Sequence, residues 1–374
     1  MVSQKKRILF FIPTLMHGGA EHVLVNLANN MDFDKYDVTV MTIMNTGHFV
    51  SALSPKVHYK HIFPCYLRGT TQFFMLFSPK LAYKLFIGDK YDIIVSYLEG
   101  TTTRILSGCS DPNVKKVAWV HIEMESKAAF SDCFRSYEEA LSCYKKFDKI
   151  VCVSETVKQC FDEVSGLGDK SIVLYNTNET AQILERMQEP VDDIEFADDC
   201  VNIVSVAKLS PTKGFDRLAH IHKRLLDEGI KNQVYIFGTG SAKYDIEPYL
   251  KAEGLVDSFT FVGYRENPYK YVAQSDLYVC SSRREGFSTA VTEALIVGVP
   301  VVSTRCSGAE ELLGSHNEYG IVTDNDEEPL YQGIKEMLTV EGNLEKYKRL
   351  AKERGKRFST ENTVKALEEM LESL

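Results

Sequence analysis

Short runs of apolar residues alternate with helix-like segments along the first half of the chain, and the same alternation restarts after Cys200. Buried strands of a parallel sheet covered on both faces appear as such continuous apolar runs, with helices between them. We therefore predict two open α/β domains in tandem, each with a parallel sheet. The runs expected to be strands are 8–12, 38–43, 93–96, 117–120, 150–153 and 172–174, then 201–206, 234–237, 259–262, 277–280 and 301–303.

The boundary between the two domains is expected near residues 181–200, because this segment is acidic and contains a Glu-Pro step at 189–190. Two domains also suit the length, since 374 residues exceed what one hydrophobic core usually serves. We assign residues 1–180 to an N-terminal Rossmann-like domain and residues 201–355 to a C-terminal one. The charged, helical end at 356–374 could finish the second domain or cross back onto the first.

The composition narrows the function classes. Apolar residues make up 44% of the chain, as in globular proteins, and the formal charge of −9 argues against a nucleic-acid binder that relies on bulk electrostatics. Nine cysteines without a C-x-x-C pair favour reduced thiols over a disulfide framework or a structural zinc site. The apolar run at 8–13 is too short for a signal-peptide core or a membrane span. We expect a cytoplasmic protein, either free or peripheral on the inner face of the membrane.

The most informative motif is a pair of carboxylates, Glu285 and Glu293, eight positions apart. Between them we expect a loop and then a helix with Ser288 as its N-cap and Gly298 as its end. Backbone amides such as those of Thr289 and Ala290 would be unpaired there and would suit a phosphate group. One glutamate could then bind a sugar and the other a ribose. Taken alone, the pair also fits a first-turn dipole partner and an exposed helical residue, so the context must decide.

Further candidate residues follow predicted strands. Open parallel sheets bind ligands at the carboxyl ends of their strands, so two such domains facing each other would place the site in an interdomain cleft. Two glycines would let backbone approach a ligand, two lysines would serve as point charges for phosphate, and one histidine ends a strand. A tight turn, solvated lysines and a structural histidine are the alternatives. The candidates are Gly18 and Gly19 after the first strand, His121 after 117–120, Lys208 and Lys213 after 201–206, and Gly238 and Tyr264 at two further strand exits.

No metal site is expected. The sequence Asp324-Asn325-Asp326 has the D-x-D form used by metal-dependent sugar transferases. It follows a short predicted strand and precedes a helix, however, where Asx turns and caps are expected. The chain also has no H-E-x-x-H motif, nucleophile elbow or P-loop, so no sequence motif favours a hydrolase or a P-loop protein.

Together these residues closely resemble the pattern of glycosyltransferase family 4 on the GT-B fold, over nearly the whole chain. The most specific element is the spacing of the two glutamates. The family's Gly-Gly-Ala-Glu loop is similar to residues 18–21, and its histidine after a mid-domain strand is similar to His121. The family's G-R-L-x-x-x-K-G motif is similar to residues 207–214, with Ala207 in place of Gly and Lys208 in place of Arg. Lysine in place of arginine keeps the positive charge but loses the bidentate hydrogen-bond geometry of the guanidinium group.

The resemblance implies a retaining hexosyltransferase that moves a hexose or N-acetylhexosamine from a nucleotide sugar, with UDP as the favoured nucleotide. It also implies that neither a metal nor another cofactor is needed. Glu285 would contact a hydroxyl of the donor sugar and Glu293 the ribose. Lys208, Lys213 and the amides at Ser288 and Thr289 would hold the diphosphate and stabilise its charge as a metal would. His121 would lie beside the donor sugar rather than act as an obligatory base.

The acceptor is expected in the N-terminal domain, where segment 73–87 is the most apolar and carries lysines. This segment could lie on a membrane surface and present the site to a lipid-linked or growing glycan in polysaccharide synthesis. It could instead be a buried helix that covers the sheet.

Two other functions remain open on the same fold. One is a sugar-nucleotide epimerase or a phosphorylase, although a phosphorylase would normally need a pyridoxal phosphate lysine and a longer chain. The other is a nucleotide-sugar-binding partner subunit without activity, which the intact Glu285, Glu293, Lys213 and His121 argue against. The sequence leaves open whether the protein forms a homo-oligomer or pairs with another transferase.

Overall fold

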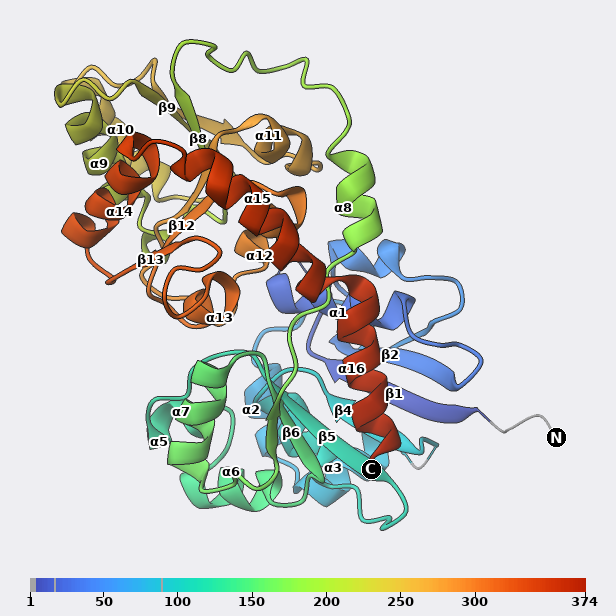
Figure 1. Ribbon diagram of the computed structural model, residues 1–374. Helices are drawn as coiled ribbons and strands as arrows, with labels where there is room; N and C mark the ends of the chain where they lie inside the picture. Colours follow the sequence, from blue (N-terminus) through green and yellow to red (C-terminus); the bar gives the residue numbers. More distant parts are fainter. Residues whose placement is uncertain (1–4, 17, 89) are drawn as a thin grey trace. The chain divides into compact units, whose positions relative to one another are not determined.

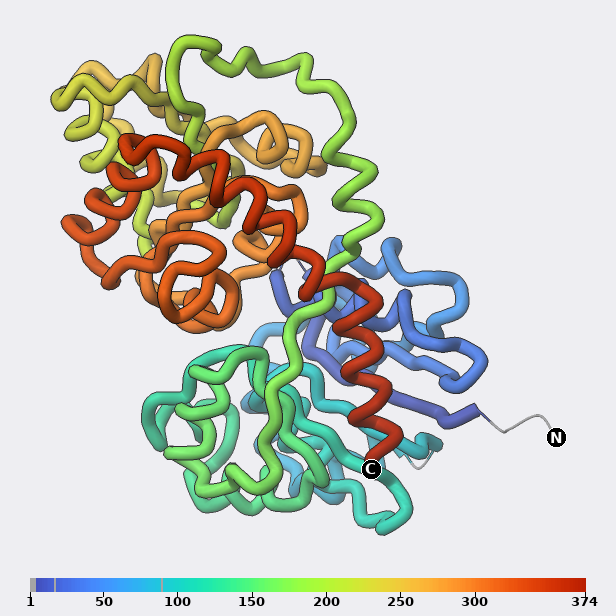
Figure 2. Tube along the Cα trace, in the orientation of Figure 1, coloured from blue at the N-terminus to red at the C-terminus, as the bar shows by residue number. Residues whose placement is uncertain are grey.

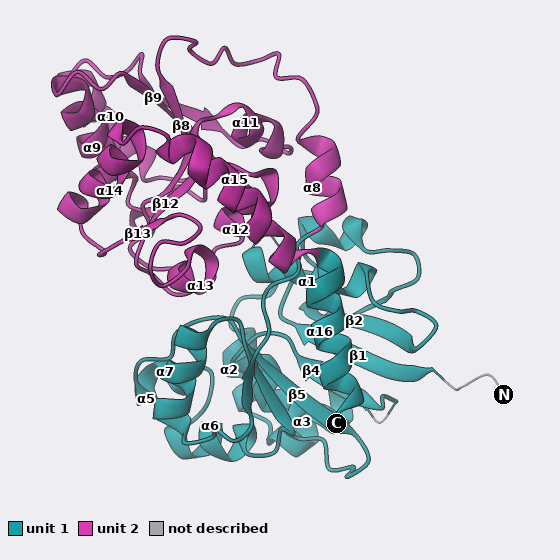
Figure 3. Ribbon diagram, viewed as in Figure 1, with its two compact units in different colours: residues 1–178, 360–374 teal, residues 179–359 magenta. Residues whose placement is uncertain are grey.

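The structure is a computed structural model that describes residues 5–16, 18–88 and 90–374 (Figure 1). These residues form two compact units (Figure 3). Unit 1 comprises the described residues up to Asn178 together with Thr360–Leu374, and unit 2 comprises Glu179–Ser359. The chain therefore enters unit 2 once and returns once, so that unit 1 is built from two separate stretches of sequence (Figure 2).

Unit 1 contains a parallel sheet of seven strands in the order β3-β2-β1-β4-β5-β6-β7. The strand order reverses between β1 and β4, which pair in parallel from Ile8 opposite Ile93. This is the topology of a doubly wound sheet, with the connecting helices packed over it. Its elements are β1 Lys6–Ile12, α1 Gly19–Asn29, β2 Tyr36–Met44, η1 His48–Ala52, β3 His58–Phe63, α2 Thr70–Met75, α3 Pro79–Phe86, β4 Ile93–Ser96, α4 Thr101–Leu106, β5 Lys115–Val120, α5 Lys127–Phe130, α6 Tyr137–Tyr144, β6 Lys149–Cys152, α7 Glu155–Ser165, β7 Ser171–Val173 and α16 Thr360–Glu372.

Unit 2 repeats this plan with six parallel strands in the order β10-β9-β8-β11-β12-β13. The order reverses between β8 and β11, where Leu277 lies opposite Ile203. Its elements are α8 Thr180–Arg186, β8 Val201–Val206, η2 Pro211–Lys213, α9 Phe215–Asp227, β9 Asn232–Phe237, α10 Lys243–Ala252, β10 Phe259–Gly263, α11 Tyr269–Gln274, β11 Leu277–Cys280, α12 Thr289–Val297, β12 Val301–Thr304, α13 Ala309–Leu313, β13 Ile321–Thr323, α14 Glu327–Thr339, α15 Asn343–Gly355 and η3 Lys356–Phe358.

The predicted fold class of two parallel-sheet α/β domains is confirmed, and each apolar run expected to be a strand coincides with one. The strand at 58–63 was not predicted. It lies at the edge of the unit 1 sheet, its side chains are partly or fully exposed, and it lacks the continuous apolar run of the central strands. In the acidic segment where only an exposed connection was expected, residues 180–186 form α8, because Ile183 is buried within unit 2.

The segment at 73–87, expected to be either a membrane-surface segment or one buried helix, forms parts of two short helices, α2 and α3. Ser78 caps the second helix by accepting a hydrogen bond from the Leu81 amide at 3.3 Å, and Pro79 occupies its first position. Phe74 is buried, whereas Leu76 and Leu85 are exposed. The segment thus packs aromatic rings against Phe63 of the edge strand β3 and presents leucines to solvent.

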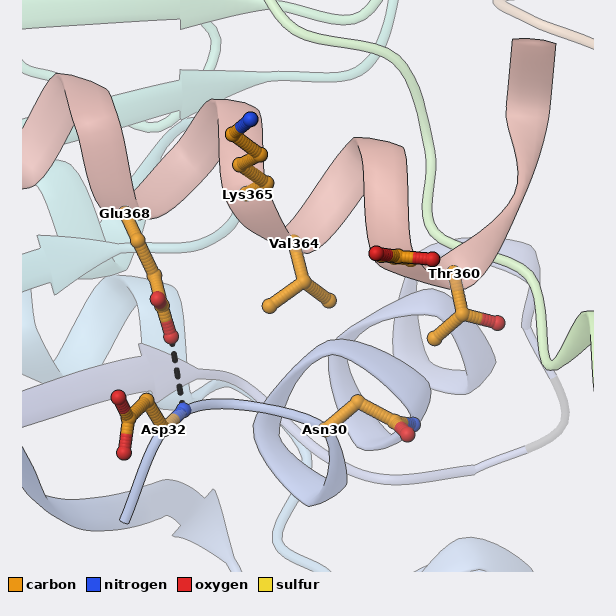
Figure 4. Close-up of a pocket in the computed structure, with 7 residues that line it drawn as sticks. Asn30, Asp32, Thr360, Val364, Lys365 and Glu368 are labelled. Atoms are coloured by element: carbon orange, nitrogen blue, oxygen red, sulfur yellow. Dashed lines mark hydrogen bonds between the residues drawn. The ribbon is translucent and has the colours of Figure 1, made fainter. Parts of the chain in front are cut away.

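Helix α16 packs on unit 1, although the residues that precede it in sequence belong to unit 2. Leu367 and Leu371 are buried, and the Asp32 amide donates a hydrogen bond to Glu368 Oε1 at 2.7 Å (Figure 4). At the start of the helix, Thr360 Oγ1 donates to the Asn178 carbonyl. The sequence left open whether this end of the chain belongs to the first or the second domain, and these contacts place residues 360–374 in unit 1.

Shortening a buried side chain of α16 should destabilise unit 1. We expect Leu367→Ala to lower the free energy of unfolding by about 2–4 kcal/mol, because the change removes buried methyl groups and leaves a cavity. The single tryptophan, Trp119, is buried in β5, so its fluorescence during urea denaturation reports on unit 1. Lys365→Ala, on the exposed face of the same helix, is the matched control. Equal midpoints for Leu367→Ala and wild type would contradict the assignment of α16 to this core.

Candidate functional site

The candidate site of unit 2 lies at the carboxyl ends of β8 and β11, the strands between which the strand order reverses. Loops at such a switch point are the common ligand site of doubly wound sheets. The loop at 207–214 follows β8 and the loop at 281–288 follows β11. They carry Lys208, Lys213 and Glu285, so three of the predicted site residues come from this edge of the sheet.

Lys213 and Glu285 form an ion pair across these two loops, with 2.5 Å between Nζ and Oε1. Ser282 Oγ donates a second hydrogen bond to the same carboxylate oxygen at 2.6 Å. The two side chains are 22% and 14% exposed, so the pair is largely shielded yet still reachable. The loops touch closely at Gly214, whose φ is +66° and where a Cβ would lie 2.1 Å from the Ser281 carbonyl oxygen.

A buried guanidinium behind this pair was missed in the sequence. Arg217 donates to the Ser281 carbonyl from Nε at 2.8 Å and Nη2 at 2.6 Å, and also to Asn325 Oδ1 at 2.9 Å. Asn325 in turn donates to the Arg283 carbonyl. Asp326 caps α14 by accepting from the Glu327 amide at 2.7 Å. The prediction that Asp324–Asp326 forms a turn and cap is therefore confirmed, and its asparagine fixes the loop that carries Glu285.

Helix α12 begins and ends as predicted. Ser288 Oγ accepts from the Val291 amide at 3.3 Å, and Gly298 ends the helix with a φ of +91°. Glu293 lies on the partly buried side of this helix, where Tyr269 donates to its Oε1 at 3.4 Å. Burial of the carboxyl group raises the pKa of Glu293 to about 7. It is not the exposed helical residue that the alternative prediction required, and its partner Tyr269 carried no recognisable sequence pattern.

The other candidates of unit 2 have different surroundings. Lys208 and Tyr264 are exposed after β8 and β10. Gly238 has a φ of +138°, and a Cβ there would lie 1.9 Å from the Ala207 carbonyl oxygen. Its amide donates to the Gly263 carbonyl at 2.9 Å, so this glycine allows three strand-exit loops to pack together.

In unit 1, the predicted double glycine lies at the start of α1, after β1. Gly18 is the N-cap, and a Cβ there would lie 1.9 Å from Glu21 Oε2, whereas the space around Gly19 is open. Burial raises the pKa of Glu21. Gly18 therefore leaves room for the Glu21 carboxyl group beside the helix start, and a larger residue there would require this side chain to move.

His121 follows β5, and its amide donates to Glu99 Oε2 at 2.9 Å. Its ring lies among those of Tyr97 and Trp119, with centroids 5.1 and 6.4 Å away. Burial lowers the pKa of His121 to about 4, so the imidazole is neutral at physiological pH. Within the described residues its Nε2 has no hydrogen-bond partner. Glu99, whose pKa is raised by burial, was not predicted and has no sequence pattern beyond its place after β4.

Within the described part of the chain, no group of three or more histidine, cysteine, aspartate or glutamate side chains is placed to hold a metal ion. No helix of residues 5–16, 18–88 and 90–374 is long and apolar enough to cross a bilayer.

Known proteins resemble both units. Residues 17–182 match the family described as Glycosyltransferase Family 4, and residues 189–357 match the one described as Glycosyl transferases group 1. The fold and these matches define a glycosyltransferase of the GT-B class. More particularly, the chain belongs to glycosyltransferase family 4, as the sequence resemblance predicted.

Individual known proteins are similar in sequence or in fold. The N-acetylgalactosamine-N,N'-diacetylbacillosaminyl-diphospho-undecaprenol 4-alpha-N-acetylgalactosaminyltransferase of Campylobacter jejuni is 27% identical, over 94% of this chain and 96% of its own length. The structure of Alr3699/HepE from Anabaena, in complex with UDP and glucose, is similar with a TM-score of 0.76 at 19% identity, covering 99% of this chain and all of the other. A glycosyltransferase from Rickettsia africae gives a TM-score of 0.78 at 17% identity, covering 98% of each chain.

The raised pKa of Glu293 should appear as a pH-dependent stability. A carboxyl group whose pKa rises from 4.5 to about 7 on folding stabilises the fold below pH 4.5, and this contribution is lost as the pH rises through 7. We therefore expect the difference in melting temperature between Glu293→Gln and wild type to shift in favour of Glu293→Gln when the pH is raised from 5 to 8. Glu353→Gln, at an exposed position of α15, is the control and should follow wild type. A Glu293→Gln difference that is the same at both pH values would refute the shift.

Proposed function

We propose that this glycosyltransferase is a retaining enzyme that moves a hexose or N-acetylhexosamine from a UDP-sugar to a lipid-linked or growing glycan. The observation that carries the proposal is the Lys213–Glu285 pair at the switch point of unit 2, three residues before the N-cap of α12. A cation, a carboxylate and unpaired helix amides there supply the groups that a sugar diphosphate needs.

In the proposed reaction, charge develops on the departing diphosphate. The ammonium group of Lys213, with Lys208 and the amides at Ser288 and Thr289, stabilises that charge, so that no metal is required. Glu285 accepts a hydrogen bond from a hydroxyl of the donor sugar, and Glu293 accepts from the ribose. When the donor replaces the Lys213–Glu285 contact, Lys213 would pair with the diphosphate charge, and Glu285 would accept hydrogen bonds from the sugar hydroxyl and from Ser282.

Retention is proposed to occur by attack on the face from which the diphosphate leaves, with a departing phosphate oxygen taking the acceptor proton. The depressed pKa of His121 supports this route, because an imidazole with a pKa of about 4 is a weak base. We assign it a neutral hydrogen-bonding role beside the donor sugar.

The acceptor is proposed to be lipid-linked, with the protein peripheral on the inner face of the membrane. The Campylobacter relative is named for a diphospho-undecaprenol acceptor and is matched over nearly its whole length. In unit 1, the α2–α3 surface consists of exposed leucines and two exposed lysines, a combination that suits the interface of an anionic bilayer. Its residues are Leu76, Leu81, Leu85, Lys80 and Lys84.

The first experiment measures nucleotide release from a panel of UDP- and GDP-sugars, without added metal, with and without extracted membrane lipids. We expect lipid-stimulated release of UDP from one donor. Lys213→Ala should reduce turnover by roughly 10²–10³-fold because the leaving group loses its cation, and His121→Ala should give a smaller defect. Lys251→Ala, an exposed lysine of α10, is the control for charge removal and should be active.

Each other outcome of this experiment has a meaning. Near-normal turnover of Lys213→Ala would refute stabilisation by charge. Conversion of the donor to another nucleotide sugar without release would identify an epimerase. Thermal stabilisation by a donor without release, in the presence of lipid extract, would favour a binding subunit without activity.

Binding to vesicles tests the peripheral location. We expect the protein to co-sediment with vesicles that contain anionic phospholipid, less so at high salt, and much less with neutral vesicles. The double change Lys80→Ala and Lys84→Ala should weaken binding roughly tenfold or more, since each basic residue near the surface is worth about 1 kcal/mol. The same change at the exposed Lys145 and Lys146 of unit 1 is the matched control. Equal losses from both pairs would show that the α2–α3 surface has no special role.

A further inference from the structure

The buried guanidinium group of Arg217 is a positive charge that unit 2 leaves without a counter-ion. Arg217 lies in the first turn of α9 and is only 4% exposed. Its hydrogen bonds run to the Ser281 carbonyl oxygen and to Asn325 Oδ1, and both of these acceptors are neutral. No carboxylate of the described residues forms an ion pair with it. Burial lowers the pKa of Arg217, but a guanidinium group keeps its charge at neutral pH.

Two carboxylates of this region are engaged by other cations. Asp216, the neighbour of Arg217 in the chain, pairs with Arg283 through Nη1 and Oδ1 at 2.7 Å and through Nη2 and Oδ2 at 2.6 Å. Glu285 pairs with Lys213. Burying an unpaired charge is costly, and a neutral donor could bond the same carbonyl and amide oxygens at a smaller cost. Such departures from the usual pattern of burial concentrate at functional sites.

The guanidinium group lies directly behind the point where the two loops of the proposed donor site meet. A Cβ at Gly214 would lie 2.8 Å from Arg217 Nε and 2.1 Å from the Ser281 carbonyl oxygen. Gly214 follows Lys213 in the chain, and Ser281 Oγ donates to the Lys213 carbonyl at 2.9 Å. The charge of Arg217 is therefore held against the backbone of both loops, the one that carries Lys213 and the one that leads to Glu285.

We propose that Arg217 is a buried cation of the donor site, whose electric field attracts the diphosphate of the nucleotide sugar without contact between them. The bound diphosphate is then the counter-ion that unit 2 does not supply. This role rests on the proposed function, because it takes a sugar diphosphate as the ligand of the two loops. It is distinct from the roles of Lys208 and Lys213, whose flexible side chains are proposed to reach the diphosphate directly.

The way in which Arg217 is held suits this role. Its three hydrogen bonds to Ser281 and Asn325 fix the guanidinium group before any ligand arrives, so no reorganisation is needed when the diphosphate binds. Because the side chain is buried, dissolved salt screens its field much less than the field of an exposed lysine. The attraction acts on phosphate charge and leaves the nucleoside part of the donor unaffected.

The test compares the binding of UDP with that of uridine, measured by isothermal titration calorimetry with uridine as a competitor of UDP. Arg217→Gln removes the charge but keeps an N–H donor, whereas Arg217→Lys keeps the charge. We expect the preference for UDP over uridine to fall roughly tenfold or more in Arg217→Gln, and to stay within about threefold of wild type in Arg217→Lys. Arg349→Gln, at an exposed arginine of α15, is the matched control and should bind like wild type. Equal losses in Arg217→Gln and Arg217→Lys would show that the hydrogen bonds matter rather than the charge, and would overturn the proposal.

A second pair of variants leaves Arg217 in place, in case its replacement prevents folding. Asn325→Asp puts a carboxylate beside the guanidinium group, and Asn325→Ala is its matched control, since both lose the hydrogen bond to the Arg283 carbonyl. We expect Asn325→Asp to lower the preference for UDP roughly tenfold relative to Asn325→Ala, with uridine bound equally by the two.

The same titrations separate this role from the proposed function. A wild-type protein that prefers UDP, with the same preference in Asn325→Asp as in Asn325→Ala, would refute the role of Arg217 and leave the proposed donor site standing. A wild-type protein that binds UDP no more tightly than uridine would contradict the proposed diphosphate site itself, and the role of Arg217 with it.

Discussion

The ion pair between Lys213 and Glu285 is the interaction on which the site of unit 2 depends. Two largely shielded charges are costly to desolvate, so each must be held close to the other and bonded further. The surrounding loop supplies those bonds: Ser282 donates to the carboxylate, and Gly214 lets the two loops approach. Arg217 fixes the Ser281 carbonyl from behind. Such a pair can exchange its partners for a charged ligand, which an apolar contact could not do.

In both units, the candidate polar groups lie near the point where the strand order of the sheet reverses. Their parallel sheets reverse strand order after the first strand of each, at β1 and β4 in unit 1 and at β8 and β11 in unit 2. The crossover helices diverge there, so the strand-exit loops are not covered by the helices that pack on the sheets. The candidate residues of each unit come from these loops and from the strand exits beside them. The chemistry differs, because unit 2 presents a cation and a carboxylate while unit 1 presents desolvated groups such as His121 and Glu21.

The fold class and the local structure around Glu285 could be predicted from the sequence because both depend on short-range patterns. Apolar runs identify central strands, and Ser288 and Gly298 are standard helix ends. Edge strand β3 was not predicted from the sequence because an exposed strand needs no apolar run. The roles of Arg217 and Tyr269 were not predicted for another reason. Each is distant in sequence from the residue it supports, and only the sheet topology brings them together.

The desolvated groups beside the candidate residues have a common physical consequence. Burial raises the pKa of Glu293, Glu99 and Glu21 and lowers that of His121, so each change favours the neutral form. In unit 2, Lys213 and Glu285 instead hold opposite charges at positions that are only 22% and 14% exposed. In such surroundings the field of a single ammonium group is poorly screened, and it acts most strongly on a charge that develops during the reaction. A diphosphate leaving group is such a charge, whereas a His121 base would have to gain a proton against the same desolvation. The burial of His121 therefore supports the proposed stabilisation of the leaving group rather than catalysis by a histidine base.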